Sequence, residues 1–284
     1  MFLMPAAINR IRRTTGTGNP QLDHSIAKLA EYSKGVFDKY CRYIAQPDDY
    51  TALSNKTVVE LGPGDTLATA FCFLAYGAAR VVCFDRFKLF LNTPKNTLIA
   101  RHLLSTLPEQ QRIRLQALLS FNDRGQALWD TSRLLYLHNR NENIELENNS
   151  VDIIVSNAVL EHVQDLDALF ASMYRILKPG GVMVHAADLK AHGLNHSTQL
   201  DFLTIPATLW KCMTFYRGAP NRMRKTGYEN LLAAHGFECT FFKVTSRISQ
   251  EDISTFMLKH PDCAARFSDD DLACGGFLFA AKKR

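Results

Sequence analysis

The sequence of 284 residues predicts an α/β fold, with a mostly parallel sheet covered by helices on both faces. Short runs of β-branched and apolar residues recur along the chain, and segments with helical periodicity alternate with several of them. Hydrophobic residues make up 46% and charged residues 21%, which is typical of a globular protein, and the length suits one large domain. The expected central strands are 57–61, 80–85, 134–138, 151–156 and 182–187.

The first half of the chain opens with a helical region and the first strand. Residues 21–44 carry apolar side chains at helical spacing, which predicts one or two amphipathic helices. Strand 57–61 stops at Gly62-Pro63-Gly64, and Asp65 or Thr66 is expected to cap the helix that follows. The turn therefore joins the end of a buried strand to the start of a helix.

The middle of the chain continues the alternation. Pro94 suits the first turn of a helix that runs to about Leu107, and residues 108–131 form a polar insertion. Asp165 is expected to cap a helix that stops at Lys178-Pro179-Gly180-Gly181.

The last third has a different pattern. Residues 189–225 are too long for a tight connection and predict a helical lid. Residues Thr226–Glu229 read as a capping box for a helix that ends at Gly236. Segments 237–244 and 275–282 predict an antiparallel pair at the sheet edge, without a crossover helix of the earlier kind between them. We treat 1–284 as one domain with parts 1–50, 55–188, 189–225 and 226–284.

Charge and cysteine content narrow the class of protein. The net charge of +5 is small and dispersed, so no nucleic-acid partner is expected. The seven cysteines include no C-x-x-C pair, which favours the reducing cytosol over a disulfide framework or zinc cluster. The N-terminus lacks the charge order of a secretion signal, and no apolar run is long enough to predict a transmembrane segment.

The turn after strand 57–61 is the strongest candidate for a ligand site. In an open α/β sheet, ligands bind beyond the carboxyl ends of the strands. Gly62 and Gly64 allow close approach of the backbone, and Glu60 and Asp85 end adjacent apolar strands. Leu67 replaces the third glycine of a redox-dinucleotide fingerprint, and no phosphate-loop lysine follows. The alternatives are that Glu60 only binds loop amides and that Asp85 only caps a turn.

Four motifs in order then resemble a known family. The segments VVELGPGDT, VVCFD, VDIIVSNAVLEHV and LKPGGVMVH look like those of class I S-adenosylmethionine-dependent methyltransferases, over about residues 55–188. The resemblance implies a Rossmann-like three-layer sandwich: a mostly parallel seven-stranded sheet with an antiparallel edge strand, plus N-terminal helices and a helical lid. It also implies S-adenosyl-L-methionine as the cofactor, bound by the core.

The resemblance assigns roles to residues that match its motifs. Glu60, Gly62 and Gly64 would line the methionine and ribose portions of the cofactor, and Asp85 would bind the ribose hydroxyls. Asn157 and Ala158 would lie near the sulfonium, with His162 orienting that loop. The usual adenine-binding Asp is missing, and Asn141 or Glu142 takes its place in the sequence. The residues assigned to the cofactor are Glu60, Gly62, Gly64, Asp85, Asn141, Asn157, Ala158 and His162.

The methyl acceptor is expected beyond the fifth strand. A hydroxyl acceptor needs a base, and His185, Asp188 and His192 are the candidates. The alternative is a metal site of the form H-x-x-D-x-x-x-H; the base is favoured, and no metal is predicted. Trp210, Asn221, Arg222 and Arg224 are the candidate acceptor-binding residues, with the arginines suited to a phosphate or carboxylate.

A second, looser resemblance covers residues 182–240. The stretch HAADL…H, Trp210 and NRMR looks like a bacterial subgroup associated with cell-surface glycans, which implies a sugar hydroxyl as acceptor. The function predicted is therefore methyl transfer to an oxygen of a saccharide or other small molecule. A lipid or quinone acceptor, suggested by the apolar lid, and a non-catalytic cofactor-binding scaffold are the alternatives.

Overall fold

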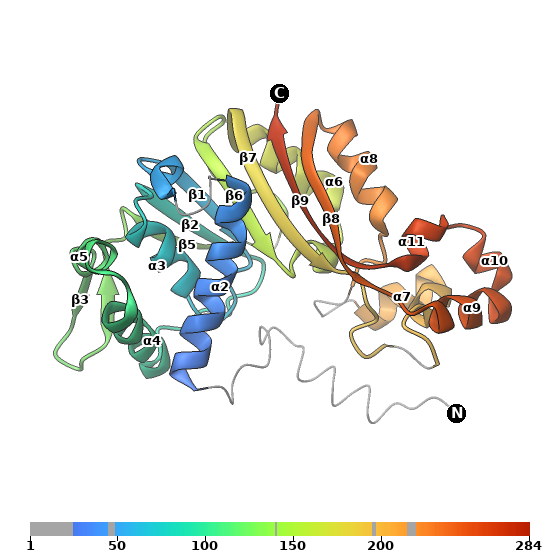
Figure 1. Cartoon of the computed structure of the whole chain (residues 1–284), viewed down its shortest axis with the longest axis horizontal. Coiled ribbons are helices and arrows are strands. Elements are labelled where there is room, and N and C mark those ends of the chain that lie inside the picture. The colour runs from blue at the N-terminus through green and yellow to red at the C-terminus, as the bar shows by residue number, and fades with distance from the viewer. Residues whose placement is uncertain (1–24, 45–48, 140, 195–196, 215–219) are drawn as a thin grey trace.

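The computed structural model describes residues 25–44, 49–139, 141–194, 197–214 and 220–284. A seven-stranded sheet runs through the molecule in the order β5-β2-β1-β6-β7-β9-β8 (Figure 1). The start of the expected N-terminal helix, residues 21–24, lies outside the described residues. The strands are β1 (Thr57–Leu61), β2 (Arg80–Asp85), β5 (Leu134–His138), β6 (Val151–Asn157), β7 (Leu177–Asp188), β8 (Phe237–Arg247) and β9 (Cys274–Lys283).

The pairing of the strands confirms a mostly parallel sheet with an antiparallel pair at one edge. Strands β5, β2, β1, β6 and β7 pair in parallel. Strand β9 runs antiparallel to both of its neighbours, β7 and β8. The reversed strand thus lies one place inside the edge, and β8 is outermost.

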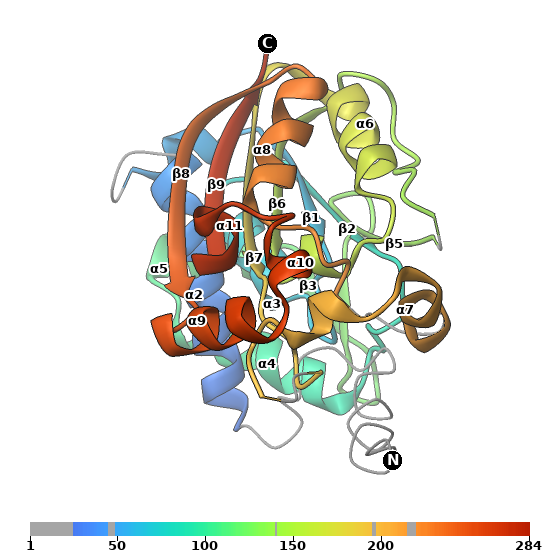
Figure 2. The ribbon, with the colours of Figure 1, turned by 90° about the vertical axis from the view of Figure 1, so that its right-hand side faces the viewer.

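Helices cover both faces of the sheet because adjacent strand residues point to opposite sides. Val58 packs in the cluster under α2, α3 and α4, whereas Val59 packs in the cluster under α6 and α8. Figure 2 shows α2 and α8 on opposite sides of the strands. These helices are α2 (Ile26–Ile44), α3 (Ala68–Ala75), α4 (Pro94–Thr106), α6 (Leu166–Ile176) and α8 (Lys225–Ala234).

The expected polar insertion has regular structure. It holds α5 (Glu109–Gln116) and a two-stranded hairpin of β3 (Leu119–Phe121) and β4 (Ala127–Trp129). Trp129 of the hairpin packs edge-on against Phe71 of α3 and Phe90, so the insertion adds to the first core cluster.

Helix ends follow the sequence signals in part. The Asp165 side chain accepts a hydrogen bond from the Ala168 N–H at 2.9 Å, so its predicted capping of α6 is confirmed. The capping box at Thr226 is wrong. Helix α8 begins at Lys225 after Arg224, and the Thr226 N–H donates to the Asp271 carboxylate instead.

A third cluster lies at one end of the sheet, where α7 and α9–α11 gather (Figure 1). Its core joins Phe202 and Trp210 from the expected lid to Phe256 and Leu272 from the β8–β9 connection. That connection therefore does hold helices, contrary to expectation. The elements are η3 (Asp201–Thr204), α7 (Ala207–Thr214), α9 (Gln250–Lys259), α10 (Pro261–Ala264) and α11 (Asp269–Ala273).

Each helix within the described ranges is too short or too polar to span a lipid bilayer.

Candidate active site

The turn between β1 and α3 requires its two glycines. Gly62 and Gly64 have φ of +62° and +77°, in the left-handed region that side chains disfavour. A Cβ at Gly62 would lie 2.4 Å from Val159 Cγ2, whereas one at Gly64 would meet nothing within 4 Å. Gly62 thus allows close packing inside the protein, and Gly64 leaves its backbone open to a ligand.

Glu60 is a buried acid directly before this turn. Its side chain is 4% exposed, and its Oε2 accepts a weak hydrogen bond from Cys83 Sγ at 3.7 Å. Burial raises the pKa of Glu60 to about 8, although hydrogen bonds from Cys83 and Thr69 oppose the shift. No basic side chain in the described ranges forms an ion pair with it. A positively charged ligand would therefore stabilise the ionised carboxylate.

Asp85 lies at the end of the neighbouring strand. The register Leu61↔Phe84 brings Asp85 level with Gly62. Its side chain is 6% exposed, and its Oδ1 accepts a hydrogen bond from the Phe87 N–H at 2.8 Å. Burial raises the pKa of Asp85 to about 6, although backbone hydrogen bonds from Phe87, Gly64 and Arg86 oppose the shift. Two buried carboxylates thus flank the glycine turn.

Asn157 and Ala158 lie on the other side of the turn, at the end of β6. Strand β1 pairs with β6 up to Leu61↔Ser156, so Asn157 is the next residue beyond the paired ends. Asn157 Oδ1 accepts a hydrogen bond from Lys39 Nζ at 2.7 Å, and its Nδ2 donates to Tyr32 Oη at 3.1 Å. Sequence reasoning missed these contacts from α2 because helical spacing does not reveal which strand a helix crosses.

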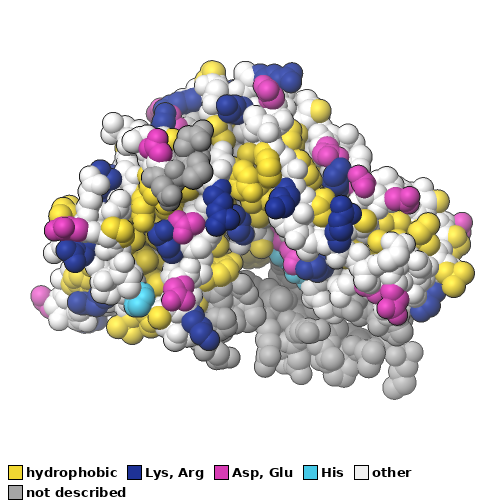
Figure 3. Space-filling view, in the orientation of Figure 1, with side chains coloured by type: hydrophobic (Ala, Val, Ile, Leu, Met, Phe, Trp, Pro, Cys, Tyr) yellow, Lys and Arg dark blue, Asp and Glu magenta, His cyan; other side chains and the backbone are white. Residues whose placement is uncertain are grey.

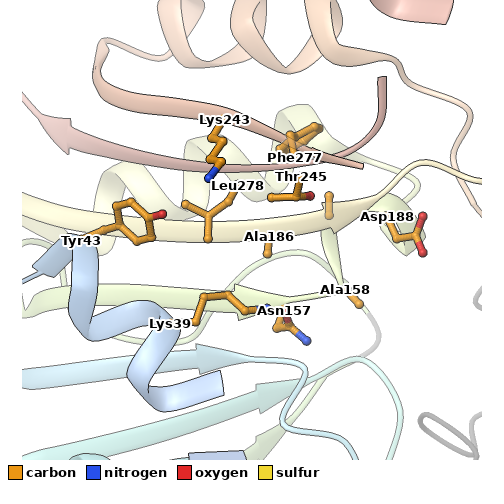
Figure 4. A pocket seen from close by; sticks show the side chains of 11 residues that line it. Lys39, Tyr43, Asn157, Ala158, Ala186, Asp188, Lys243, Thr245, Phe277 and Leu278 are labelled. Atoms are coloured by element: carbon orange, nitrogen blue, oxygen red, sulfur yellow. Dashed lines mark hydrogen bonds between the residues drawn. The ribbon is translucent and has the colours of Figure 1, made fainter. Parts of the chain in front are cut away.

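A cavity of about 400 Å³ opens beside Asn157, between α2 and the strands β7, β9 and β8 (Figure 4). Tyr43 and Leu278 contribute apolar surface, Lys39 and Lys243 lie on opposite sides, and Asp188 lies at one end. Figure 3 shows exposed hydrophobic side chains over the middle of this face, with basic side chains to either side. The lining residues are Lys39, Tyr43, Asn157, Ala158, Ala186, Ala187, Asp188, Lys243, Thr245, Phe277 and Leu278.

The three candidate bases occupy different surroundings. His185 is fully buried, with Nδ1 2.7 Å from Ser156 Oγ, and burial lowers its pKa to about 3. It does not line the cavity, so a role as acceptor base is not supported. Asp188 lines the cavity, and its Oδ1 accepts a hydrogen bond from the Lys190 N–H at 3.1 Å. His192 is exposed, with Nε2 3.0 Å from the Asp188 carbonyl oxygen.

The two remaining cofactor candidates lie in short polar segments. Asn141 is exposed after β5, and its side chain accepts a hydrogen bond from the Asn143 N–H at 3.1 Å. An ion pair of 3.7 Å between Arg86 and Glu142 ties this loop to the end of β2. His162 ends the short helix η2 (Leu160–His162), and its ring centroid lies 5.0 Å from that of His192.

Three of the four candidate acceptor-binding residues, Asn221, Arg222 and Arg224, donate hydrogen bonds to backbone carbonyl groups. Trp210 is 4% exposed within the third cluster, and the Arg222 guanidinium lies 5.0 Å from its ring centre. Asn221 donates from Nδ2 to the carbonyl oxygens of Leu160 at 2.7 Å and Val163 at 2.8 Å. None of the four lines the cavity.

The burial of Arg224 does not fit the acceptor-binding role that the sequence suggested for it. Only 3% of its surface is exposed, and its guanidinium donates to the backbone carbonyl oxygens of Leu189, Asp271 and Cys274. Arg222 likewise donates to the Ile205 carbonyl. Because Arg224 is buried with its donors on backbone carbonyl groups, and Arg222 does not line the cavity, the lysines that line it are better placed to meet an acceptor.

Comparisons with known proteins identify the family of the chain. The model of the methyltransferase domain family matches residues 32–240. No curated protein matches.

Solved structures of methyltransferases are similar to the chain at low sequence identity, and one of them has a TM-score above 0.5. A geranyl diphosphate C-methyltransferase from Streptomyces coelicolor A3(2) is 12% identical over 100% of both chains, with a TM-score of 0.52. An S-adenosylmethionine-dependent methyltransferase from Mesorhizobium loti is 18% identical, covering 81% of this chain and 92% of that one, with a TM-score of 0.45. Because the family model spans well over half of its residues, the chain belongs to the methyltransferase domain family, as its resemblance to class I S-adenosylmethionine-dependent methyltransferases predicted.

Proposed function

We propose that the protein transfers the methyl group of S-adenosyl-L-methionine to a hydroxyl oxygen of a small molecule, with a saccharide hydroxyl as the favoured acceptor. The supporting observation is continuity between two sites. Asn157 and Ala158 line the cavity; Asn157 also ends β6, the strand paired with β1 beside the glycine turn, and Ala158 comes directly after it. A donor on the turn and an acceptor in the cavity would meet at these two residues.

The buried acids fit the charge of this donor. When bound, S-adenosyl-L-methionine supplies a methyl group on a positively charged sulfur, together with an ammonium group. Glu60 offsets that positive charge, and Asp85 accepts hydrogen bonds from the ribose hydroxyls. Gly64, which has open space on its Cβ side, lets the backbone approach the donor. The family match, and the lack of an ion pair to Glu60 among the described residues, support this assignment.

The cavity suits an acceptor that is partly apolar and partly anionic. Tyr43 and Leu278 present an apolar surface for its body, and the ammonium groups of Lys39 and Lys243 suit a carboxylate or phosphate. Asp188 is the one carboxylate among the described lining residues, and we assign it as the base that accepts the hydroxyl proton. Holding the hydroxyl oxygen about 3 Å from the methyl carbon provides the remaining rate enhancement.

The donor site is tested by Asp85→Ala. We expect cofactor affinity to fall at least tenfold, about 1.4 kcal/mol, because the ribose loses its acceptor. Isothermal titration calorimetry with S-adenosyl-L-methionine measures this, and Asp123→Ala, an exposed acid in the β3–β4 hairpin, is the control. Unchanged affinity in Asp85→Ala would remove this residue from the site.

The acceptor side is tested by Asp188→Asn. Turnover should fall at least tenfold, while cofactor affinity stays near that of the unaltered protein, because only the proton acceptor is removed. Radiolabelled donor is incubated with nucleotide-linked sugars, uronic acids, quinols and lipid extracts, and Asp123→Asn serves as control. Cofactor binding without transfer to any of these acceptors would favour a non-catalytic scaffold.

A further inference from the structure

Three metal-ligating side chains gather next to the cavity, and we propose that Glu161, His162 and His192 bind a divalent transition-metal ion. Each offers a ligand atom, and these atoms all lie within 4.8 Å of one another. Glu161 and His162 follow β6, and His192 follows β7, whose end pairs in parallel with that of β6. The carboxyl ends of two central strands thus bring together residues 30 positions apart.

Glu161 supplies the observation that points to a ligand. Its side chain is 1% exposed, and Oε1 accepts a hydrogen bond from the Asp188 N–H at 3.0 Å. Oε2 is buried and has no hydrogen-bond partner within the described part of the chain. Burying an unpaired carboxylate oxygen is costly, whereas a metal ion would satisfy it.

His192 is held in a position that suits a ligand. Its ring lies edge-on to that of His162, with centroids 5.0 Å apart. One ring nitrogen, Nε2, is 3.0 Å from the Asp188 carbonyl oxygen, the kind of contact that orients metal-binding histidines through their other nitrogen. Its φ of +47° lies in a region that non-glycine residues adopt at a cost, so the loop presents this ring under backbone strain.

The donor set indicates which ion would bind. Two imidazoles and one carboxylate suit Zn²⁺, Mn²⁺ or Co²⁺, whereas Mg²⁺ and Ca²⁺ prefer oxygen ligands. Ligand atoms around a tetrahedral ion lie about 3.3 Å apart, so the side chains must close by small rotations, and His192 is exposed enough to move. Three protein ligands leave a coordination position open.

This set differs from the H-x-x-D-x-x-x-H pattern in the sequence. His185 of that pattern points into the sheet, and the Asp188 side chain lines the cavity. Asp188 instead links the two sites through its backbone, since its N–H contacts Glu161 and its carbonyl contacts His192. An ion here would therefore lie next to the proposed acceptor position, although its binding does not depend on the proposed function.

Titration calorimetry on the metal-stripped full chain, with a phosphine reductant and no methyl donor or acceptor, tests the proposal. ZnCl₂ and MnCl₂ are expected to bind with one ion per chain, and MgCl₂ more weakly. Visible absorption of added Co²⁺ should show the d–d bands of a site of low coordination number. His192→Ala and Glu161→Gln should each weaken binding at least about tenfold, whereas His102→Ala on α4 should not.

His192→Ala changes an exposed loop residue and is expected to fold, which circular dichroism verifies, so this variant decides the result if Glu161→Gln does not fold. Absence of saturable binding, or equal binding by His192→Ala and the unaltered chain, overturns the proposal. Because the readout is ion binding alone, a protein that binds the ion and never transfers a methyl group contradicts the proposed function only.

Discussion

At the scale of single residues, burial of charge is the most informative property of this protein. Glu60 and Asp85 are carboxylates at the ends of adjacent strands, and both are nearly inaccessible to solvent. Burial raises the pKa of Glu60, and the nearby negative charge of Asp85 raises it further. A fold retains such groups at a cost in stability. A cationic ligand would offset this cost, and the glycine turn between Glu60 and Asp85 lies where such a ligand would bind.

The raised pKa of Glu60 predicts a pH dependence of stability. Its ordinary value is 4.5 and its value in the fold is about 8, so between these values the folded chain binds more protons than the unfolded chain. The contribution of protonated Glu60 to the free energy of unfolding is complete below pH 4.5. It falls as the pH rises from 4.5 and is lost once the pH has passed about 8. One proton corresponds to at most about 1.4 kcal/mol per pH unit.

Glu60→Gln should therefore flatten the fall in unfolding free energy between pH 5 and pH 8, as measured by urea denaturation of the cofactor-free protein at several pH values. Glu147→Gln, at an exposed position, is the control. Parallel pH profiles for Glu60→Gln and the unaltered protein would show that Glu60 is already ionised in the fold.

At the scale of elements, the β1–α3 connection places the ligand site. Helix α3 begins at Ala68, and its N-cap residue, Leu67, has no side chain that can accept a hydrogen bond. All eight residues of the helix are buried. Thr66 Oγ1 accepts a hydrogen bond from the Ala68 N–H at 3.3 Å, so the turn itself contributes the polar contact at this end. The loop must be compact, and the two glycines make this possible for different reasons.

Gly62→Ala and Gly64→Ala should separate these reasons. Gly64→Ala should cost about 1–2 kcal/mol for its left-handed conformation alone. Gly62→Ala should cost about 1–3 kcal/mol more, since its Cβ would collide with Val159 Cγ2. Gly35→Ala, on helix α2 with open space around it, should stabilise by about 0.5–1 kcal/mol. Urea denaturation provides the comparison, and equal costs at Gly62 and Gly64 would contradict the packing argument.

At the scale of the whole molecule, buried Arg224 joins the third cluster to the sheet. Its donors reach Leu189 after β7, Asp271 in α11 and Cys274 at the start of β9. The segment after β7 and the β8–β9 connection, separated by more than 50 residues, are thereby held to one side chain. Phe202 and Trp210, two aromatic residues of the expected lid, accordingly pack inward.

Arg224→Met should lower the unfolding free energy by roughly 3–5 kcal/mol, because several buried carbonyl groups lose their donors. Amide hydrogen exchange should rise most in α9–α11, while cofactor affinity should stay nearly constant. Arg222→Met, which removes one backbone hydrogen bond and a half-buried stacking contact, should cost less. If Arg224→Met impaired acceptor binding at unchanged stability, a direct role in substrate recognition would be restored.

The positions along the chain of the strands in the large sheet, the glycine turn and the family could be predicted from the amino-acid sequence. Apolar runs, the glycines of the turn and the Asp165 cap act through neighbouring residues, so their signals are readable along the chain. The strand predicted at 151–156 and the helix predicted from Asp165 are present for this reason.

The contacts of the polar side chains could not be predicted in this way, because they depend on how distant segments pack together. Arg224 and His185 look like substrate and catalytic groups in sequence, yet both are buried by segments far away in the chain. Lys39 reaches Asn157 across 118 positions, and Glu161 meets His192 only because the ends of β6 and β7 lie side by side. Such contacts depend on how helices and strands pack, and local residue patterns carry no record of that packing.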